Sequence, residues 1–159
     1  PGDMFAAWGE NGYEGGDLKY PVAEANQVGE GYVQKFQGGF LTRNPDGKNQ
    51  VSFGAIGKKY KDMGGVESPL GFPTDGEKKV EGGFFQEFEH GSIYWSPESG
   101  AHYILKGAIM DEWGKKGWEH GEFGWPTSDY SEIAAGGLKQ EFQHGTISEV
   151  MGRVQTEKK

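Results

Sequence analysis

The heptapeptide Pro69-Leu70-Gly71-Phe72-Pro73-Thr74-Asp75 recurs in edited form along the chain, and the predicted architecture follows from it. Its second proline fixes its own φ and holds Phe72 in the extended region, and Gly71 permits backbone angles that are closed to other residues. The stretch therefore predicts a rigid bend that presents one large ring at a defined angle. Edited copies stand at residues 122–129 and 17–23, and in each an aromatic residue directly precedes a proline.

The bend prolines Pro21, Pro73 and Pro126 are 52 and 53 residues apart, and other residues keep this spacing. These are the pairs Met4/Trp8, Ile56/Tyr60 and Ile109/Trp113, and the glutamines Gln34, Gln86 and Gln140. Several independent markers at one spacing indicate internal repetition. We therefore predict three repeats, at residues 1–53 (a degenerate copy), 54–106 and 107–150, followed by a C-terminal tail at 151–159 that we expect to fray.

Each repeat is expected to begin with a short helical turn, because an apolar residue and an aromatic residue stand four positions apart, as at Ile109 and Trp113. Two hairpins should follow. Alternation along the first strand of the middle repeat places Phe84, Gln86 and Phe88 on the inward face. A buried glutamine must find hydrogen-bond partners, and nearby loop carbonyls are the expected ones.

The first hairpin is expected to turn at His90-Gly91, and at His144-Gly145 in the third repeat, because two-residue turns favour residues that accept positive φ. That register directs Ile93 and Trp95 inward and Tyr94 outward. The predicted fold class is mainly β: a tandem array of three small β units, each with two hairpins and a short helical turn at its start. A closed β-trefoil is the alternative, although the helical openings favour an open array.

The chain carries 16 basic and 24 acidic residues, for a formal net charge of −8. This balance argues against nucleic acid or an anionic membrane as the main partner. There is no cysteine, so neither a disulfide framework nor a thiolate ligand is available. No apolar run approaches the length of a membrane helix, and we expect no membrane insertion. We expect the chain to be a portion of a longer protein.

Sugar recognition usually combines a flat aromatic surface with a few polar groups. The candidate ligand-binding residues are Trp118, Tyr94, Phe85, Trp125, Phe72, Asp75, Asp129 and His120. Trp118 stands where the middle repeat has Gly65, so a structural task shared by these two repeats does not explain it. Phe72 and Trp125 can cap a core and still show one face. Asp75 and Asp129 can instead cap local N–H groups.

Metal, cofactor and catalytic chemistry are not expected. The recurring histidines, His90 and His144, belong to different repeats, and no ligand spacing gathers the histidines into a metal site. No nucleophile elbow, phosphate loop or triad-like arrangement is present. We therefore predict that the chain is not an enzyme. A pair of surface carboxylates acting as a glycoside hydrolase stays open as an alternative.

The middle repeat resembles the LGFP repeat in Leu70-Gly71-Phe72-Pro73-Thr74-Asp75, in the stretch 86–97 and in Gly100-Ala101-His102. The third repeat resembles it up to Ile147, and the first has Lys19 where the others have glycine. The resemblance implies a secreted, non-catalytic module of the envelope of mycolic-acid-bearing actinobacteria. Such modules hold mycoloyltransferases or cell-wall hydrolases on the arabinogalactan–peptidoglycan polymer.

The function expected from these observations is binding to cell-wall polysaccharide through surface aromatics, by a monomer or by a module fused to a catalytic domain. Repeated weak sites on a repetitive polymer would gain from avidity. The alternative is a structural spacer or a protein-interaction module.

Overall fold

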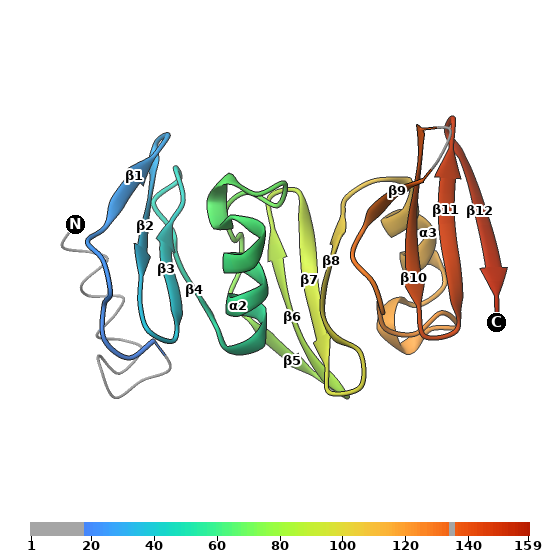
Figure 1. The fold of residues 1–159 in the computed structure, drawn as a ribbon, viewed down its shortest axis with the longest axis horizontal. Helices are drawn as coiled ribbons and strands as arrows, with labels where there is room; N and C mark the ends of the chain where they lie inside the picture. The colour runs from blue at the N-terminus through green and yellow to red at the C-terminus, as the bar shows by residue number, and fades with distance from the viewer. Residues whose placement is uncertain (1–17, 134–135) are drawn as a thin grey trace. The chain divides into compact units, whose positions relative to one another are not determined.

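The computed structural model describes residues 18–133 and 136–159, so the Met4/Trp8 pair of the first predicted helix lies outside the described residues. The described part is mainly β, with three four-stranded antiparallel sheets in place of a closed trefoil (Figure 1). Strands follow one another in chain order across each sheet, so every connection is a hairpin. This confirms the predicted array of small β units.

The first sheet contains β1 (Asn26–Val28), β2 (Gly31–Lys35), β3 (Gly39–Arg43) and β4 (Asn49–Phe53). The second contains β5 (Lys78–Val80), β6 (Gly83–Phe88), β7 (Gly91–Ser96) and β8 (Gly100–Leu105). The third contains β9 (Ser131–Ile133), β10 (Gly137–Phe142), β11 (Gly145–Val150) and β12 (Arg153–Lys158). The helices between them are α2 (Gly54–Met63), η2 (Gly65–Glu67), α3 (Ala108–Lys115) and η3 (Trp118–His120).

The chain divides into two compact units. Of the described residues, unit 1 contains 18–78 and 86–89, and unit 2 contains 79–85, 90–133 and 136–159. These boundaries fall inside the second sequence repeat. Each unit therefore joins the sheet of one repeat to the helix and the bend of the next repeat.

The three bends share one backbone arrangement. Pro21, Pro73 and Pro126 each form an isolated antiparallel bridge, to Phe36, Phe88 and Phe142 respectively. The N–H of the aromatic residue before each proline donates to a side-chain oxygen of the following hairpin turn. These bonds run from Tyr20 to Gln37 at 3.3 Å, from Phe72 to Glu89 at 2.9 Å and from Trp125 to Gln143 at 3.1 Å. The first, degenerate copy therefore forms the same bend as the other two.

Lys19 has the positive φ that the backbone of the bend requires at this position. Its φ is 62°, close to the 76° of Gly71 and the 77° of Gly124 at the equivalent positions. A side chain in the left-handed region costs roughly 1–2 kcal/mol for a non-glycine residue. The hydrogen bonds of the bend therefore hold Lys19 in a conformation that its own propensity disfavours.

Each helix is tied to the bend that follows it by one buried hydrogen bond. The hydroxyl of Tyr60 donates to the carbonyl of Gly71 at 2.6 Å, and Nε1 of Trp113 donates to the carbonyl of Gly124 at 3.1 Å. Both rings are fully buried. Burial, with the nearby Glu89 carboxylate as a smaller cause, raises the pKa of Tyr60 far above its ordinary value.

In the second and third bends, the ring directly before the proline packs on a glycine that begins a strand of the preceding repeat. A side-chain carbon on Gly31 would lie 2.6 Å from Cζ of Phe72, and one on Gly83 would lie 2.7 Å from Cη2 of Trp125. Only glycine leaves room for such a ring. We call each of these positions a glycine slot. Phe72 and Trp125 are therefore buried to 7% exposure, and they join consecutive repeats.

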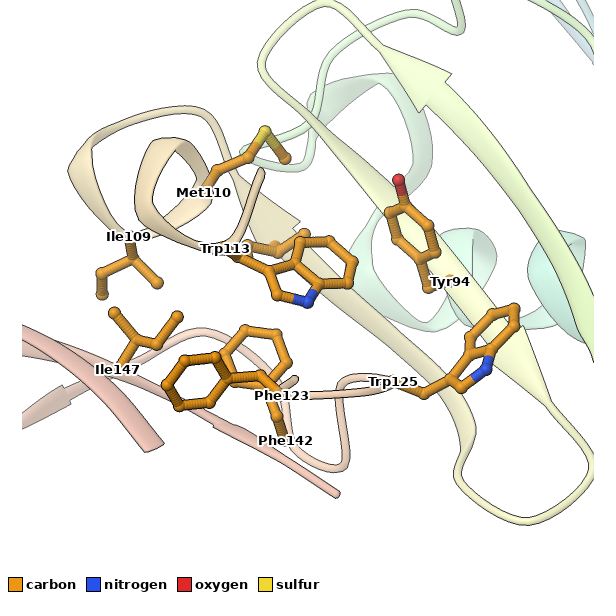
Figure 2. Close-up of a cluster of buried hydrophobic side chains, with 9 residues drawn as sticks. Tyr94, Ile109, Met110, Trp113, Phe123, Trp125, Phe142 and Ile147 are labelled. Atoms are coloured by element: carbon orange, nitrogen blue, oxygen red, sulfur yellow. The ribbon is translucent and has the colours of Figure 1, made fainter. Parts of the chain in front are cut away.

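Trp113 lies at the centre of the core of unit 2 (Figure 2). Its ring is 4.9 Å from that of Tyr94 and 5.2 Å from that of Phe142, centroid to centroid. Ile109 and Ile147 complete the apolar contact between α3 and the third sheet. The predicted helical face of Ile109 and Trp113 is thus observed.

The repeated glutamines have the structural role that we predicted for them. Nε2 of Gln86 donates to the carbonyls of Asp75 at 2.9 Å and Val51 at 3.2 Å, and Oγ of Ser52 donates to its Oε1 at 3.0 Å. Gln34 makes one such bond, to the carbonyl of Ala23 at 3.1 Å, and Gln140 binds the carbonyl of Ser128. In each repeat the amide therefore fixes the loop that follows the bend.

Gln86→Ala is expected to lower the free energy of unfolding by about 2 kcal/mol, because it leaves several buried polar groups without partners. Gln34→Ala removes a single bond from a half-buried side chain, and the expected loss is about 1 kcal/mol or less. Urea denaturation of both variants measures the difference. Equal losses would show that the buried network of Gln86 contributes nothing beyond one bond.

The predicted hairpin turn is wrong by one residue. Phe142 pairs with Gly145, so the two turn residues are Gln143 and His144, and Gly145 begins the next strand. The glycine is needed for space, because a side-chain carbon at position 145 would lie 2.8 Å from the ring of Phe123 and 2.5 Å from the carbonyl oxygen of Glu157. β6 likewise ends at Phe88 and β7 begins at Gly91.

The predicted frayed tail is also wrong. β12 pairs with β11 over six residues, from Val150↔Arg153 to Gly145↔Lys158. The turn between them contains Met151, whose φ is 51°. The third repeat therefore has a complete sheet of its own.

Candidate functional site

Trp118 lies at the tip of a short loop between α3 and the third bend. The loop is closed at its base, where the N–H of Glu122 donates to the carbonyl of Lys116 at 3.2 Å. The indole lies against Gly114, where a side-chain carbon would be 2.6 Å from its Cζ2, and meets the ring of Trp113 edge to face at 5.4 Å. One part of the ring is thus supported by the core, while 43% of the residue is exposed.

The backbone of Trp118 has a positive φ of 59°, and the equivalent residue of the preceding repeat, Gly65, has 63°. A left-handed conformation costs roughly 1–2 kcal/mol for a residue with a side chain. For a bulky residue such a φ is a genuine outlier, and backbone outliers cluster at functional sites. A glycine would relieve the strain, as it does at Gly65. Trp118 thus combines an exposed indole with a strained backbone.

Polar groups surround this indole. Nε2 of His120 donates to the carbonyl of Glu81 at 2.8 Å, and the Glu119 carboxylate lies 3.8 Å from its Nδ1. Glu122 pairs with Lys158 at 2.8 Å and with Lys116 at 3.4 Å. The hydrogen bond from Lys158 is the largest cause that lowers the pKa of Glu122, and Lys116 adds to it. An apolar ring face with hydrogen-bonding groups beside it suits a sugar ring.

The other predicted contact rings do not share this exposure. Tyr94 was expected to face outward, and this is wrong, because it is only 7% exposed and packs on Trp113 and Trp125. Phe85 is half-buried and stacks on Tyr94 at 5.1 Å. With Phe72 and Trp125 in the glycine slots, these rings belong to the packing of the repeats. Of the predicted residues, the structure brings together only Trp118 and His120 as an exposed pair.

Asp75 and Asp129 have local partners. Oδ1 of Asp75 accepts from the N–H of Gly76 at 2.9 Å, and its other oxygen lies 2.9 Å from Nζ of Lys78. The hydrogen bond from Lys78 is the largest cause that lowers the pKa of Asp75. Oδ1 of Asp129 accepts from the N–H of Tyr103 at 3.3 Å and lies 3.3 Å from Nδ1 of His102. Both contacts agree with the alternative reading of these residues as structural.

Unit 1 contains a groove of about 310 Å³ that the sequence did not predict. Three lysines line it (Lys35, Lys58 and Lys61), together with the backbone of Gly38 and Gly57. The sequence does contain one indication of this groove, which is a difference in charge between repeats. Glu87 and Asp111 occupy the positions that correspond to Lys35 and Lys58. It is visible only when the repeats are aligned with one another.

Within residues 18–133 and 136–159, no group of three or more acidic or histidine side chains is placed to hold a metal ion. None of the helices described there is both long and apolar enough to cross a membrane. The site consists of a supported aromatic surface with polar neighbours.

Bend, four-stranded sheet and helix recur in this chain with a spacing of 52 to 53 residues, which defines a tandem-repeat β protein. The family model of the LGFP repeat matches residues 18–68 and 70–121, and the chain belongs to this family. Each match begins at the buried leucine of a bend, Leu18 or Leu70. The family is one of repeat modules and not a catalytic family. No curated protein matches the chain.

Proposed function

We propose that the chain is a non-catalytic module that anchors to the arabinogalactan–peptidoglycan polymer of a cell envelope, with Trp118 as its main contact. The observation that carries the proposal is the strained, exposed indole of Trp118, at a position where the preceding repeat has glycine. Glu119, His120 and Glu122 offer hydrogen bonds to the hydroxyl rim of a sugar. Membership in a family of repeat modules supports a binding role over a catalytic one.

The localisation that goes with this proposal is secreted and envelope-bound, and the partner is a polysaccharide. Stacking of a sugar on one indole is worth roughly 0.5–1.5 kcal/mol, by analogy with aromatic pairs. One such site binds weakly. Several modules on one repetitive polymer would bind more tightly through avidity.

Trp118→Gly is expected to weaken the retention of the chain on purified polymer, because it removes the ring and leaves the backbone in a conformation that glycine accepts. The expected loss in affinity is about two- to twelve-fold, the equivalent of the stacking energy above. Co-sedimentation with the insoluble polymer at low salt measures it. The matched control is Tyr20→Ala, which removes an exposed ring at another place.

Equal retention of Trp118→Gly and the parent would exclude Trp118 as the contact. No retention of the parent chain would exclude the anchoring role itself. The second candidate, a spacer or protein-interaction module, would then stand. It is favoured by one observation, the burial of Tyr94, Phe72 and Trp125 in the packing between repeats.

A further inference from the structure

The first bend differs from the other two in its exposure. Tyr20 is 58% exposed and Val22 is 60% exposed, whereas Phe72 and Trp125 are each 7% exposed. Pro21 is exposed too, while Pro73 and Pro126 are buried. The hydrogen bonds and the β-bridge of the first bend match those of the others. The ring of Tyr20 is therefore presented in the same way as the two buried rings, but it is not covered.

What covers the equivalent rings is visible twice in this chain. Phe72 packs on the glycine that begins β2, and Trp125 packs on the glycine that begins β6. In both cases the cover is the four-stranded sheet of a neighbouring repeat. The two internal contacts therefore show what kind of surface covers such a ring. It is a sheet with an unfilled glycine slot.

We propose that Tyr20, Pro21 and Val22 form a docking surface for the sheet of a further repeat of this kind. The occupant is not the third sheet of a second copy. Its corresponding glycine, Gly137, already has Cγ2 of Val150 at 2.7 Å and Cδ1 of Ile133 at 3.1 Å from where a side-chain carbon would be. The slots at Gly31 and Gly83 are filled by Phe72 and Trp125, so the partner must offer a slot of its own.

Charge and polarity agree with this choice. β12 at the edge of the third sheet is exposed along its whole length, and its residues 153–158 are mostly polar. Lys139 and Ser148 stand in the third sheet where the second has the apolar rings Phe85 and Tyr94, which Trp113 and Trp125 cover. The first sheet, which accepts Phe72, has Val33 and buried Thr42 at those positions, so a sheet that accepts Tyr20 should carry uncharged side chains there.

The test adds a sheet with an open glycine slot to the full chain. A copy of residues 18–52 joined directly to Pro1 places the copied Gly31 at the same distance along the sequence from Tyr20 as Gly31 has from Phe72. The copied segment carries Tyr20→Phe, so that nitration at position 20 reports on the original Tyr20 alone. Nitration of tyrosine by tetranitromethane, followed by peptide mass spectrometry, reports its exposure. Buried Tyr60 is the internal reference.

The expected result is a fall of roughly eight-fold in the nitration rate of Tyr20, the ratio of its exposed fraction of 58% to the 7% of Phe72. A second fusion with Gly31→Val in the copied sheet fills the slot, and Tyr20 should then react as it does in the parent chain. Unchanged nitration with an open slot would overturn the proposal. An added sheet that stays unprotected in hydrogen exchange, while the original β2 and β3 are protected, would overturn it too. Neither outcome depends on polymer binding by Trp118.

Discussion

Replacing Trp113 with alanine is expected to destabilise unit 2 by about 3–5 kcal/mol, the usual cost of removing a fully buried large aromatic ring. The ring contacts Tyr94, Phe142 and Trp118, so its loss leaves a cavity that three other rings border. It also leaves the carbonyl of Gly124 without its donor in the third bend. Urea denaturation followed by circular dichroism measures the loss.

Trp113→Phe separates the two contributions. It keeps an aromatic ring in the core but removes the N–H donor, and the expected cost is about 1–3 kcal/mol. Trp118→Ala is the control for tryptophan content, and it should cost less because the residue is 43% exposed. If Trp113→Ala proved no more costly than Trp118→Ala, Trp113 would not be the centre of the core of unit 2.

Gly83→Val is expected to destabilise unit 2 by about 3 kcal/mol or more, because overpacking strains both backbone and side chains. A side-chain carbon at this position would lie 2.0 Å from the carbonyl oxygen of Trp95 and 2.7 Å from the indole of Trp125. The first atom is backbone and has little freedom to move. The indole of Trp125, in the third bend, would therefore be displaced. Its fluorescence should then become accessible to quenching by acrylamide.

The control for glycine content is Gly76→Ala. Gly76 does not require a positive φ, and the nearest atom to a side-chain carbon there is Oε1 of Gln50 at 3.8 Å. That variant should unfold within about 0.5 kcal/mol of the parent, as surface substitutions usually do. A similar loss in both glycine variants would mean that backbone entropy, and not the contact with Trp125, explains the effect at Gly83.

Much of the fold could be predicted because proline and glycine act locally. The bends at Pro21, Pro73 and Pro126 follow from residues next to one another, and the sequence spacing then predicts how many there are. The hairpin register was missed for a different reason. Gly145 suggested a turn that needs positive φ, but its real role is to make room for Phe123, which lies 22 positions earlier in the sequence. Local patterns do not report such contacts.

The candidate site was only partly predictable for the same reason. Alternation along β7 directs Tyr94 away from Ile93, and the sequence pattern alone predicts that the face with Tyr94 contacts solvent. In the structure both residues are buried, because another repeat covers that face. Tyr20 shows the converse, since the same motif that buries Phe72 leaves Tyr20 exposed. Trp118 could be singled out because it replaces a glycine, but its positive φ is visible only in the structure.

Phe72 and Trp125, each directly before a bend proline, fasten their repeat to the sheet of the repeat before it. Native-state hydrogen exchange of Phe72→Ala tests this most directly. Phe72 packs on Gly31 of β2, so the amides of β2 and β3 should lose about 3 kcal/mol of protection, close to the cost of removing a buried phenylalanine. The amides of β10 and β11 should keep theirs. Loss confined to β5–β8, with β2 and β3 unchanged, would contradict the claim.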